Sequence, residues 1–139
     1  MKSFNHENAS PEMIKDIFDG AAIDSEFDDD GDLYVTGGVD FPFWATLVPD
    51  HNLVQFKTHV RVKKEASDED VLSLVNRANS RIMLPQFFMV SDEEGRVIQG
   101  VYYLAYEYGI DSRLVIKIAR RFPSAFKACG EIDEDNVIP

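Results

Sequence analysis

The sequence is poor in the residues from which metal sites and covalent catalysis are built. Its 139 residues include one cysteine, Cys129, and three histidines. A single cysteine excludes an intramolecular disulfide and is typical of a reducing compartment. No Cys-x-x-Cys or His-x-x-x-His spacing occurs, and zinc sites need clustered ligands of that kind. We therefore expect no metal, no cofactor and no catalytic residue.

Basic charge and long apolar runs are also scarce. The sequence has 14 Lys and Arg residues and 25 Asp and Glu residues, which gives a net charge of −11 at pH 7. Such a field repels phosphate backbones and anionic lipid, so we expect neither nucleic acid nor a membrane as a partner. No stretch approaches the roughly 20 apolar residues of a membrane span, and the N-terminus lacks the apolar core of a signal peptide. A cytoplasmic location is expected.

One acidic run, Asp28 to Asp32, resembles part of a calcium-binding loop. With Gly31 at the invariant glycine of an EF-hand loop, Gly37 falls where the bidentate glutamate is required. The pattern fails at that position. Because Asp and Gly are the residues that tight turns favour, the run predicts a β-turn between two strands.

Hydrophobic periodicity predicts a helix, a meander of strands, and a second helix. Ser10-Pro11-Glu12 has the composition of a helix start, with Ser10 as the cap and Pro11 in the first turn. Ser67 begins the second predicted helix, which Pro85 prevents from continuing. The strands expected between these helices cover 22–27, 33–36, 41–48 and 53–62.

The last third of the chain predicts a hairpin and a third helix. Two apolar runs, 86–91 and 97–106, flank a four-residue loop that ends at Gly95. Asp111 then caps a helix in which Leu114 and other apolar residues are expected to face inward. Pro123 is expected to kink or split this helix.

The order helix, strands, helix, hairpin, helix predicts an α+β fold, in which three helices pack on one antiparallel sheet. We expect a loose N-terminus over residues 1–9, a single domain over 10–130, and an acidic, mobile tail over 131–139.

Three segments of this sequence resemble the YbjN family, whose members are described as bacterial sensory transduction regulators. They are the turn Asp29 to Leu33 with Phe41-Pro42-Phe43-Trp44, the strand Leu53 to Thr58, and Val75 to Arg81 with Gln86 to Met89. The resemblance spans roughly residues 11–126. It implies a fold like that of type III secretion chaperones, which are small, acidic, often dimeric proteins that bind polypeptides. It implies no catalytic residue.

Aromatic residues give the first candidate for a binding surface. Alternation places Trp44 on the side of its strand opposite Phe41 and Phe43, so one of these groups lies on the face that helices leave uncovered. A tyrosine-rich strand adds further aromatic side chains, and tyrosine and tryptophan are enriched in protein interfaces. The tyrosines considered are Tyr102, Tyr103 and Tyr106. The alternative is a half-buried strand whose hydroxyl groups reach water.

Basic residues on the last predicted helix give the second candidate. Arg113, Lys117, Arg120 and Arg121 fall on its outward side. In an acidic protein this stripe is either a solvated helix face or a contact for acidic segments.

Together these observations predict a noncatalytic, protein-binding domain that acts as a regulator or chaperone-like binder and forms a homodimer. Two alternatives stay open. One is a small enzyme or ligand binder with a tyrosine and carboxylate pocket, for example Tyr103 with Glu107. The other is an immunity-type inhibitor of a basic toxin, which the charge of −11 also fits.

Overall fold

The computed structural model describes residues 3–139 and contains one large antiparallel sheet, one small sheet and three helices within that range. The helices are α1 (Pro11–Gly20), α2 (Asp68–Arg81) and α3 (Ser112–Glu131). The strands are β1 (Ser3–Phe4), β2 (Asp24–Phe27), β3 (Leu33–Gly37), β4 (Phe43–Val48), β5 (Leu53–Arg61), β6 (Gln86–Asp92), β7 (Gly95–Ala105) and β8 (Ile110–Asp111). A single 3₁₀ turn (Pro49–His51) joins β4 to β5. The α+β class and the element order predicted from the sequence are confirmed.

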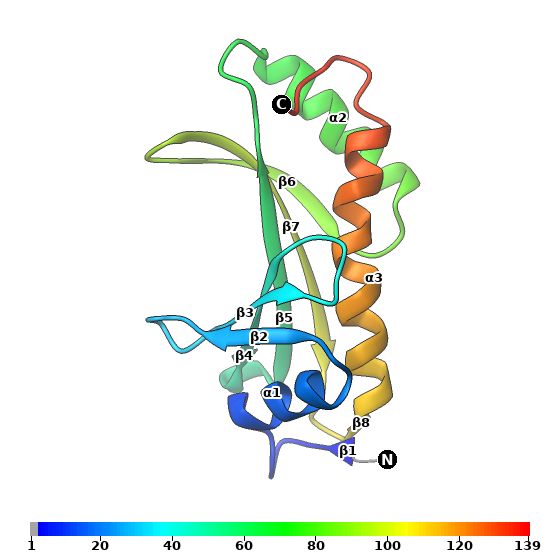
Figure 1. Cartoon of the computed structure of the whole chain (residues 1–139). Helices are drawn as coiled ribbons and strands as arrows, with labels where there is room; N and C mark the ends of the chain where they lie inside the picture. Colours follow the sequence, from blue (N-terminus) through cyan, green and yellow to red (C-terminus); the bar gives the residue numbers. More distant parts are fainter. Residues whose placement is uncertain (1–2) are drawn as a thin grey trace.

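The large sheet has the strand order β2-β3-β4-β5-β7-β6 and every pairing in it is antiparallel. Its centre is the long β5–β7 ladder, which runs from Leu53 opposite Ala105 to Arg61 opposite Val97. In Figure 1, α3 runs along one side of this sheet, while β1 and β8 form a separate pair beside the start of α3.

The two faces of the sheet differ in what covers them. Phe43, Phe56, Ile98 and their neighbours on one face belong to a single buried cluster with side chains of all three helices. We call this the inner face. The opposite side chains of the same strands, among them Trp44 and Tyr103, form the outer face, which no helix of the described chain covers.

Local sequence signals account for the helix starts. Ser10 Oγ accepts a hydrogen bond from Met13 N at 3.1 Å, and Ser67 Oγ accepts one from Asp70 N at 3.1 Å. Asp111 Oδ1 accepts from Arg113 N at 2.7 Å. Each cap satisfies a backbone N–H that the first helical turn leaves without a partner. All three predicted caps are confirmed.

The acidic run is a turn between β2 and β3, as predicted. Asp28 Oδ1 accepts hydrogen bonds from Asp30 N at 2.9 Å and Asp32 N at 3.0 Å. Gly31 lies at φ +83°, a left-handed conformation that glycine adopts without strain. The Asp28 carboxylate is thus used to hold its own loop together.

Phenylalanine rings join α3 to the inner face. Phe122 and Phe126 are buried, and Phe126 stacks on Phe41 with ring centroids 5.5 Å apart and meets Phe87 at 5.4 Å. Gly100 on β7 lies beneath this ring: a Cβ at that position would come 2.5 Å from Phe126 Cζ. The absence of a side chain at Gly100 therefore sets how closely α3 approaches the sheet.

Pro123 does not split the last helix, contrary to the expectation from the sequence. α3 continues through it for 20 residues. Proline removes one backbone hydrogen-bond donor, but Phe122 and Phe126 on either side are both buried against the sheet, and this burial holds the two halves on one helix. A second expectation was also wrong, because Leu114 is 39% exposed rather than inward-facing.

The chain ends are docked, in contrast to the loose and mobile segments expected. Phe4 is buried and pairs with Ile110 across β1 and β8, whereas residues 1–2 lie outside the described part. Near the C-terminus, the Asp133 carboxylate accepts hydrogen bonds from Val137 N at 2.9 Å and Ile138 N at 2.8 Å. Val137 is fully buried, and its carbonyl accepts from Lys63 N at 2.9 Å.

The β6–β7 hairpin is tighter than predicted. The strands pair as far as Asp92 opposite Gly95, which leaves a two-residue turn in place of a four-residue loop. Gly95 adopts φ +132°, and Asp92 Oδ1 accepts from Glu94 N at 2.9 Å. The sequence did not predict the last pair of this ladder, Asp92 with Gly95, because both residues are turn-forming types and were counted as part of the loop.

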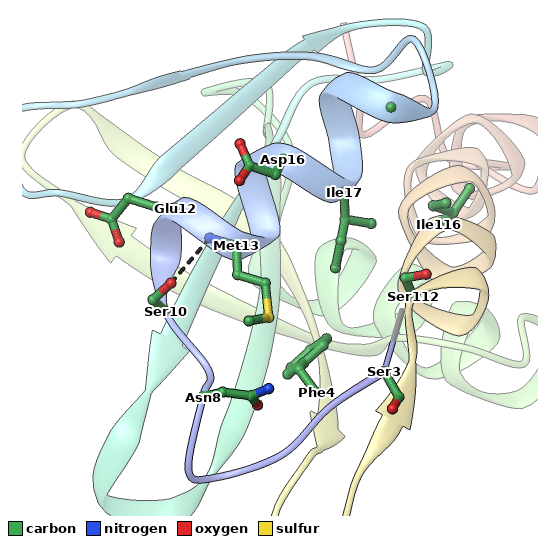
Figure 2. A pocket seen from close by; sticks show the side chains of 11 residues that line it. Ser3, Phe4, Asn8, Ser10, Glu12, Met13, Asp16, Ile17, Ser112 and Ile116 are labelled. Atoms are coloured by element: carbon green, nitrogen blue, oxygen red, sulfur yellow. Dashed lines mark hydrogen bonds between the residues drawn. The ribbon is translucent and has the colours of Figure 1, made fainter. Parts of the chain in front are cut away.

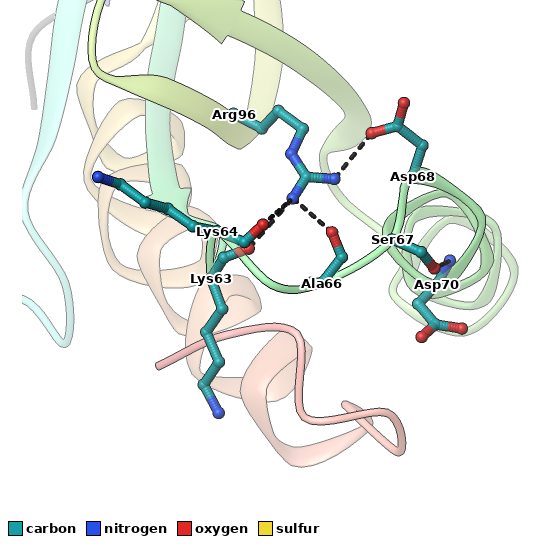
Figure 3. Close-up of polar contacts among 7 residues, drawn as sticks. All are labelled: Lys63, Lys64, Ala66, Ser67, Asp68, Asp70 and Arg96. Atoms are coloured by element: carbon teal, nitrogen blue, oxygen red, sulfur yellow. Dashed lines mark hydrogen bonds and ion pairs between the residues drawn. The ribbon is translucent and has the colours of Figure 1, made fainter.

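Arg96 on β7 fixes the connection between β5 and α2 (Figure 3). Its guanidinium donates to the carbonyls of Lys63 at 3.1 Å, Lys64 at 3.3 Å and Ala66 at 2.5 Å, and it pairs with Asp68 at 2.7 Å. Nη2 lies within hydrogen-bonding distance of all three carbonyls and Nη1 pairs with the carboxylate, so the two terminal nitrogens of the planar guanidinium hold different partners. The start of α2 is thereby tied to the sheet.

We predict that Gly100→Ala destabilises the fold by about 1 to 3 kcal/mol, because the new methyl group must displace the packed Phe126 ring. Urea unfolding measures this change. Gly130→Ala is the matched control, since nothing lies within 4 Å of a Cβ at that helical position. If both variants lose stability equally, close packing at Gly100 is not the cause.

We predict that Arg96→Lys costs about 1.5 to 3 kcal/mol, because lysine keeps the charge but has one nitrogen and cannot hold the carbonyls and the Asp68 carboxylate at the same time. Hydrogen exchange of the first-turn amides of α2 should accelerate in this variant. Arg81→Lys, an exposed change at the other end of α2, should leave exchange unaltered. Unchanged protection in Arg96→Lys would show that the connection is held by other contacts.

Candidate binding surfaces

A row of three rings lies across β3, β4 and β5 on the outer face. Tyr34 on β3 lies 4.7 Å from Trp44 on β4, measured between ring centroids. Trp44 in turn stacks on His59 of β5 at 5.9 Å, with the two planes 9° apart. Register explains the row, because Tyr34 is directly opposite Trp44 and Trp44 is directly opposite Lys57, one pleat from His59. The Trp44 side chain therefore lies on the outer face of the sheet.

Positive charge accompanies these rings. Partial burial, together with the charges of Arg61 and Lys57, lowers the pKa of His59 below its usual value of 6.5, against an opposing effect of Asp92. Arg61 itself donates two hydrogen bonds of 2.7 Å to Asp92, and this pairing holds the pKa of the Asp92 carboxyl at about 2. The lowered pKa favours the neutral form of the His59 ring, which stacks on Trp44.

The remainder of the outer face is a mixture of apolar and amide side chains. Val97 and Val101 of β7 are buried, although neither belongs to the main core. Tyr103 is 43% exposed, and its hydroxyl accepts a hydrogen bond from Gln55 Nε2 at 3.0 Å. A small apolar layer thus lies on the uncovered side, bounded by groups that can form hydrogen bonds.

The structure separates the tyrosines proposed from the sequence. Tyr103 lies on the outer face with Trp44, whereas Tyr102 is opposite Phe56 on the inner face and is half-buried. Tyr106 is buried against Phe4, with ring centroids 5.7 Å apart, and burial raises its pKa. Tyr106 follows the end of β7 at Ala105 and therefore contributes no exposed aromatic surface.

The basic stripe lies where it was expected, on the exposed side of α3. Arg113, Lys117, Arg120 and Arg121 are all exposed. Arg113 pairs with Asp111 at 2.7 Å, which raises the pKa of Arg113 and lowers that of Asp111. Arg120 Nη2 donates to the carbonyl of Ala21 at 3.1 Å, so this side chain links α3 to the end of α1.

A hollow of about 840 Å³ lies between α1, the start of α3 and the N-terminal segment (Figure 2). Met13 and Ile17 point from α1 toward Phe4, and Ile116 lies across from them on α3. Glu12 and Asp16 line the same hollow from the outer side of α1. A second, more open hollow of about 600 Å³ lies beside Met83 and Tyr102.

Neither hollow is lined by a cysteine or a histidine. Burial raises the pKa of the Cys129 thiol to about 11, which keeps it protonated and unreactive.

The tyrosine and carboxylate pair considered from the sequence is not assembled. Glu107 is exposed beyond the end of β7, and in residues 3–139 no hydrogen bond joins its carboxylate to Tyr103. The same part of the chain holds no cluster of three His, Cys, Asp or Glu side chains suited to a metal ion. None of its helices is both long and apolar enough to cross a bilayer.

Residues 10–131 match the model of the YbjN family, which is described as "putative bacterial sensory transduction regulator". The chain belongs to the YbjN family. No protein of curated function matches it in sequence.

Two solved structures share the fold. One is "Crystal structure of YbjN, a putative transcription regulator from E. coli", with a TM-score of 0.79 at 13% identity over 94% of this chain and 96% of that one. The other is the HopA1–SchA chaperone–effector complex, with a TM-score of 0.57 at 10% identity over 88% and 91% of the two chains. At these identities the likeness shows the fold alone. The family and the chaperone-like fold predicted from the sequence are confirmed.

Sequence reasoning missed Tyr34 and the hollow beside α1. Alternation along β3 already put Tyr34 on the other face of the strand from Leu33 and Val35. If β3 had been paired with β4, Tyr34 would have been placed beside Trp44. The hollow gave no local signal, because Phe4 reaches it only through the pairing of β1 with β8.

We predict that the pKa of His59 measured by NMR titration lies below 6.5, and that Lys57→Met raises it by removing a neighbouring positive charge. Because the folded pKa is the lower one, the unfolded chain takes up this proton first. The contribution of His59 to stability is therefore complete above pH 6.5 and declines as the pH falls toward the folded value. A titration midpoint at or above 6.5 in the wild-type protein would contradict the stacked, partly desolvated ring.

Proposed function

We propose that this YbjN-family chain is a noncatalytic protein-binding domain of the regulator type, and that it forms a homodimer through the outer face of its sheet. The observation that carries the proposal is the row of Tyr34, Trp44 and His59, which are half-buried on a sheet face that no helix covers, with the 43% exposed Tyr103 on the same face. Aromatic side chains offer large contact areas at low entropic cost and are enriched at interfaces.

The composition of the outer face supports association rather than simple solvation. A sheet face that meets only water is expected to be polar along each strand. Here β5 is polar along its outer side, but the neighbouring β7 buries Val97 and Val101 there, and Tyr34 and Trp44 form a row of rings with His59. A second copy covering this layer would remove the rings from water, while Gln55 and the Tyr103 hydroxyl could form hydrogen bonds at the rim.

A noncatalytic role is supported by the separation of the reactive groups. His59, Cys129 and Glu107 lie in three different parts of the molecule, on β5, at the end of α3 and in the turn after β7. Nucleophilic catalysis requires a nucleophile, a base and an orienting group within hydrogen-bonding distance.

The comparisons support binding of a polypeptide. The family is described as a regulator of sensory transduction, and SchA is named as a chaperone in complex with its effector. We infer a protein partner for this chain as well, distinct from the second copy. A cytoplasmic location remains our prediction, in agreement with the single cysteine.

Sedimentation equilibrium from about 1 to 100 μM tests the homodimer. We predict a mass that approaches twice 15.8 kDa as the concentration rises. Tyr103→Arg places charge in the outer face and should weaken association at least about tenfold.

Tyr108→Arg is the matched control, because Tyr108 is 93% exposed in a turn outside the outer face. It should associate as the wild type does. A wild-type mass of 15.8 kDa throughout, or equal weakening by both substitutions, would refute a dimer formed on the outer face.

A further inference from the structure

The hollow beside α1 has an apolar floor that follows the helix. Met13 and Ile17 are four residues apart, so they form one ridge along α1, and Phe4 and Ile116 face that ridge from the other side. Both α1 side chains are only half-buried. The floor therefore offers apolar surface that the fold itself leaves partly open to water.

Charges of opposite sign border the two sides of this floor. Glu12 and Asp16 line the hollow on the α1 side. On the other side, Ser112 and Ile116 line it. The residues that follow them on α3, just outside the lining, are Arg113, which pairs with Asp111 at 2.7 Å, and the exposed Lys117. Within residues 3–139 no ion pair joins the acidic border to the basic one. Gly20 lines the hollow at the end of α1, and the carbonyl of the next residue, Ala21, accepts a hydrogen bond from Arg120.

From this arrangement we propose that the hollow binds an amphipathic helix of a partner protein, with basic residues on the flank over α1 and acidic residues on the flank over α3. The ridge of Met13 and Ile17, four residues apart on α1, can pack against apolar side chains spaced three or four residues apart on a partner helix. α1 has ten residues, so a partner helix alongside it needs about three turns, or about 15 Å.

A second copy of this chain fits the hollow less well. Two copies related by a twofold axis would bring two concave surfaces together, and these leave the floor unfilled. A convex helix fills it. A purely basic partner helix would satisfy Glu12 and Asp16 but place like charges beside Arg113 and Lys117, at a cost in affinity.

The inference rests on the proposed protein-binding function and names the class of polypeptide that is bound. It uses a surface separate from the outer face, because no residue of the outer face lines this hollow. The two proposals can therefore fail independently.

The test uses three synthetic peptides of 14 residues, acetylated and amidated, which share one leucine stripe. The bipolar peptide carries Lys on one flank and Glu on the other, the second carries Lys on both flanks, and the third carries Glu on both. Binding to the full chain is measured by calorimetry at about 0.15 M salt, where long-range attraction is screened. We expect the bipolar peptide to bind at least about tenfold more tightly than either of the others.

Three variants locate the site. Ile116→Glu should abolish binding of the bipolar peptide, while Leu114→Glu, an exposed position on another side of α3, should not affect it. The double change Glu12→Lys with Asp16→Lys should shift the preference to the Glu peptide, because both borders are then basic. Circular dichroism of each variant checks that the fold is kept.

Tightest binding by the Lys peptide would overturn the inference, since it would reflect only the net charge of −11. The absence of binding by all three peptides would also overturn it. Tyr103→Arg should bind the bipolar peptide as the wild type does. If the peptides fail while the wild-type chain still dimerises, the homodimer stands and only the helix-binding hollow is refuted.

Discussion

The seating of α3 on the sheet is the constraint on which the rest of the structure depends. Phe126 occupies the space above Gly100 that any other residue would fill, and its ring is held by Phe41 and Phe87. Removing a buried phenylalanine typically costs about 3 to 5 kcal/mol, a large share of the stability of a domain this size. α3 continues through Pro123, and the burial of Phe122 and Phe126 on either side offsets the lost hydrogen bond and the steric clash that an interior proline brings.

The two proposed binding surfaces both depend on this position of α3. With all three helices packed on the inner face, the outer face is left with its own thin layer of Val97, Val101 and stacked rings. The hollow beside α1 has a related origin, because α3 begins at the pair of β1 and β8 and leaves a space between its first turns and α1. One surface is flat and aromatic and the other is concave and bordered by charge, which suits them to different partners.

The sequence predicted the elements of the fold well because their signals are local. Caps at Ser10, Ser67 and Asp111 and the alternation of β5 depend only on neighbouring residues. The errors concern contacts between distant segments. Residues 131–139 have the composition of a mobile tail, yet Asp133 closes a loop that buries Val137 beneath Lys63. The same limit applies to the candidate sites: alternation gave the direction of Trp44 relative to Phe43, but only the packing of the helices decides which of them remains uncovered, and it also buries Tyr106.

Trp44 is the only tryptophan, so its accessibility reports directly on the outer face. The decisive measurement is collisional quenching of Trp44 fluorescence by acrylamide as the protein concentration is raised. If the outer face is the dimer interface, quenching falls as the mass doubles, with the same midpoint, and it stays high at every concentration in Tyr103→Arg. Quenching that does not change while the mass doubles would show that the interface lies elsewhere on the molecule.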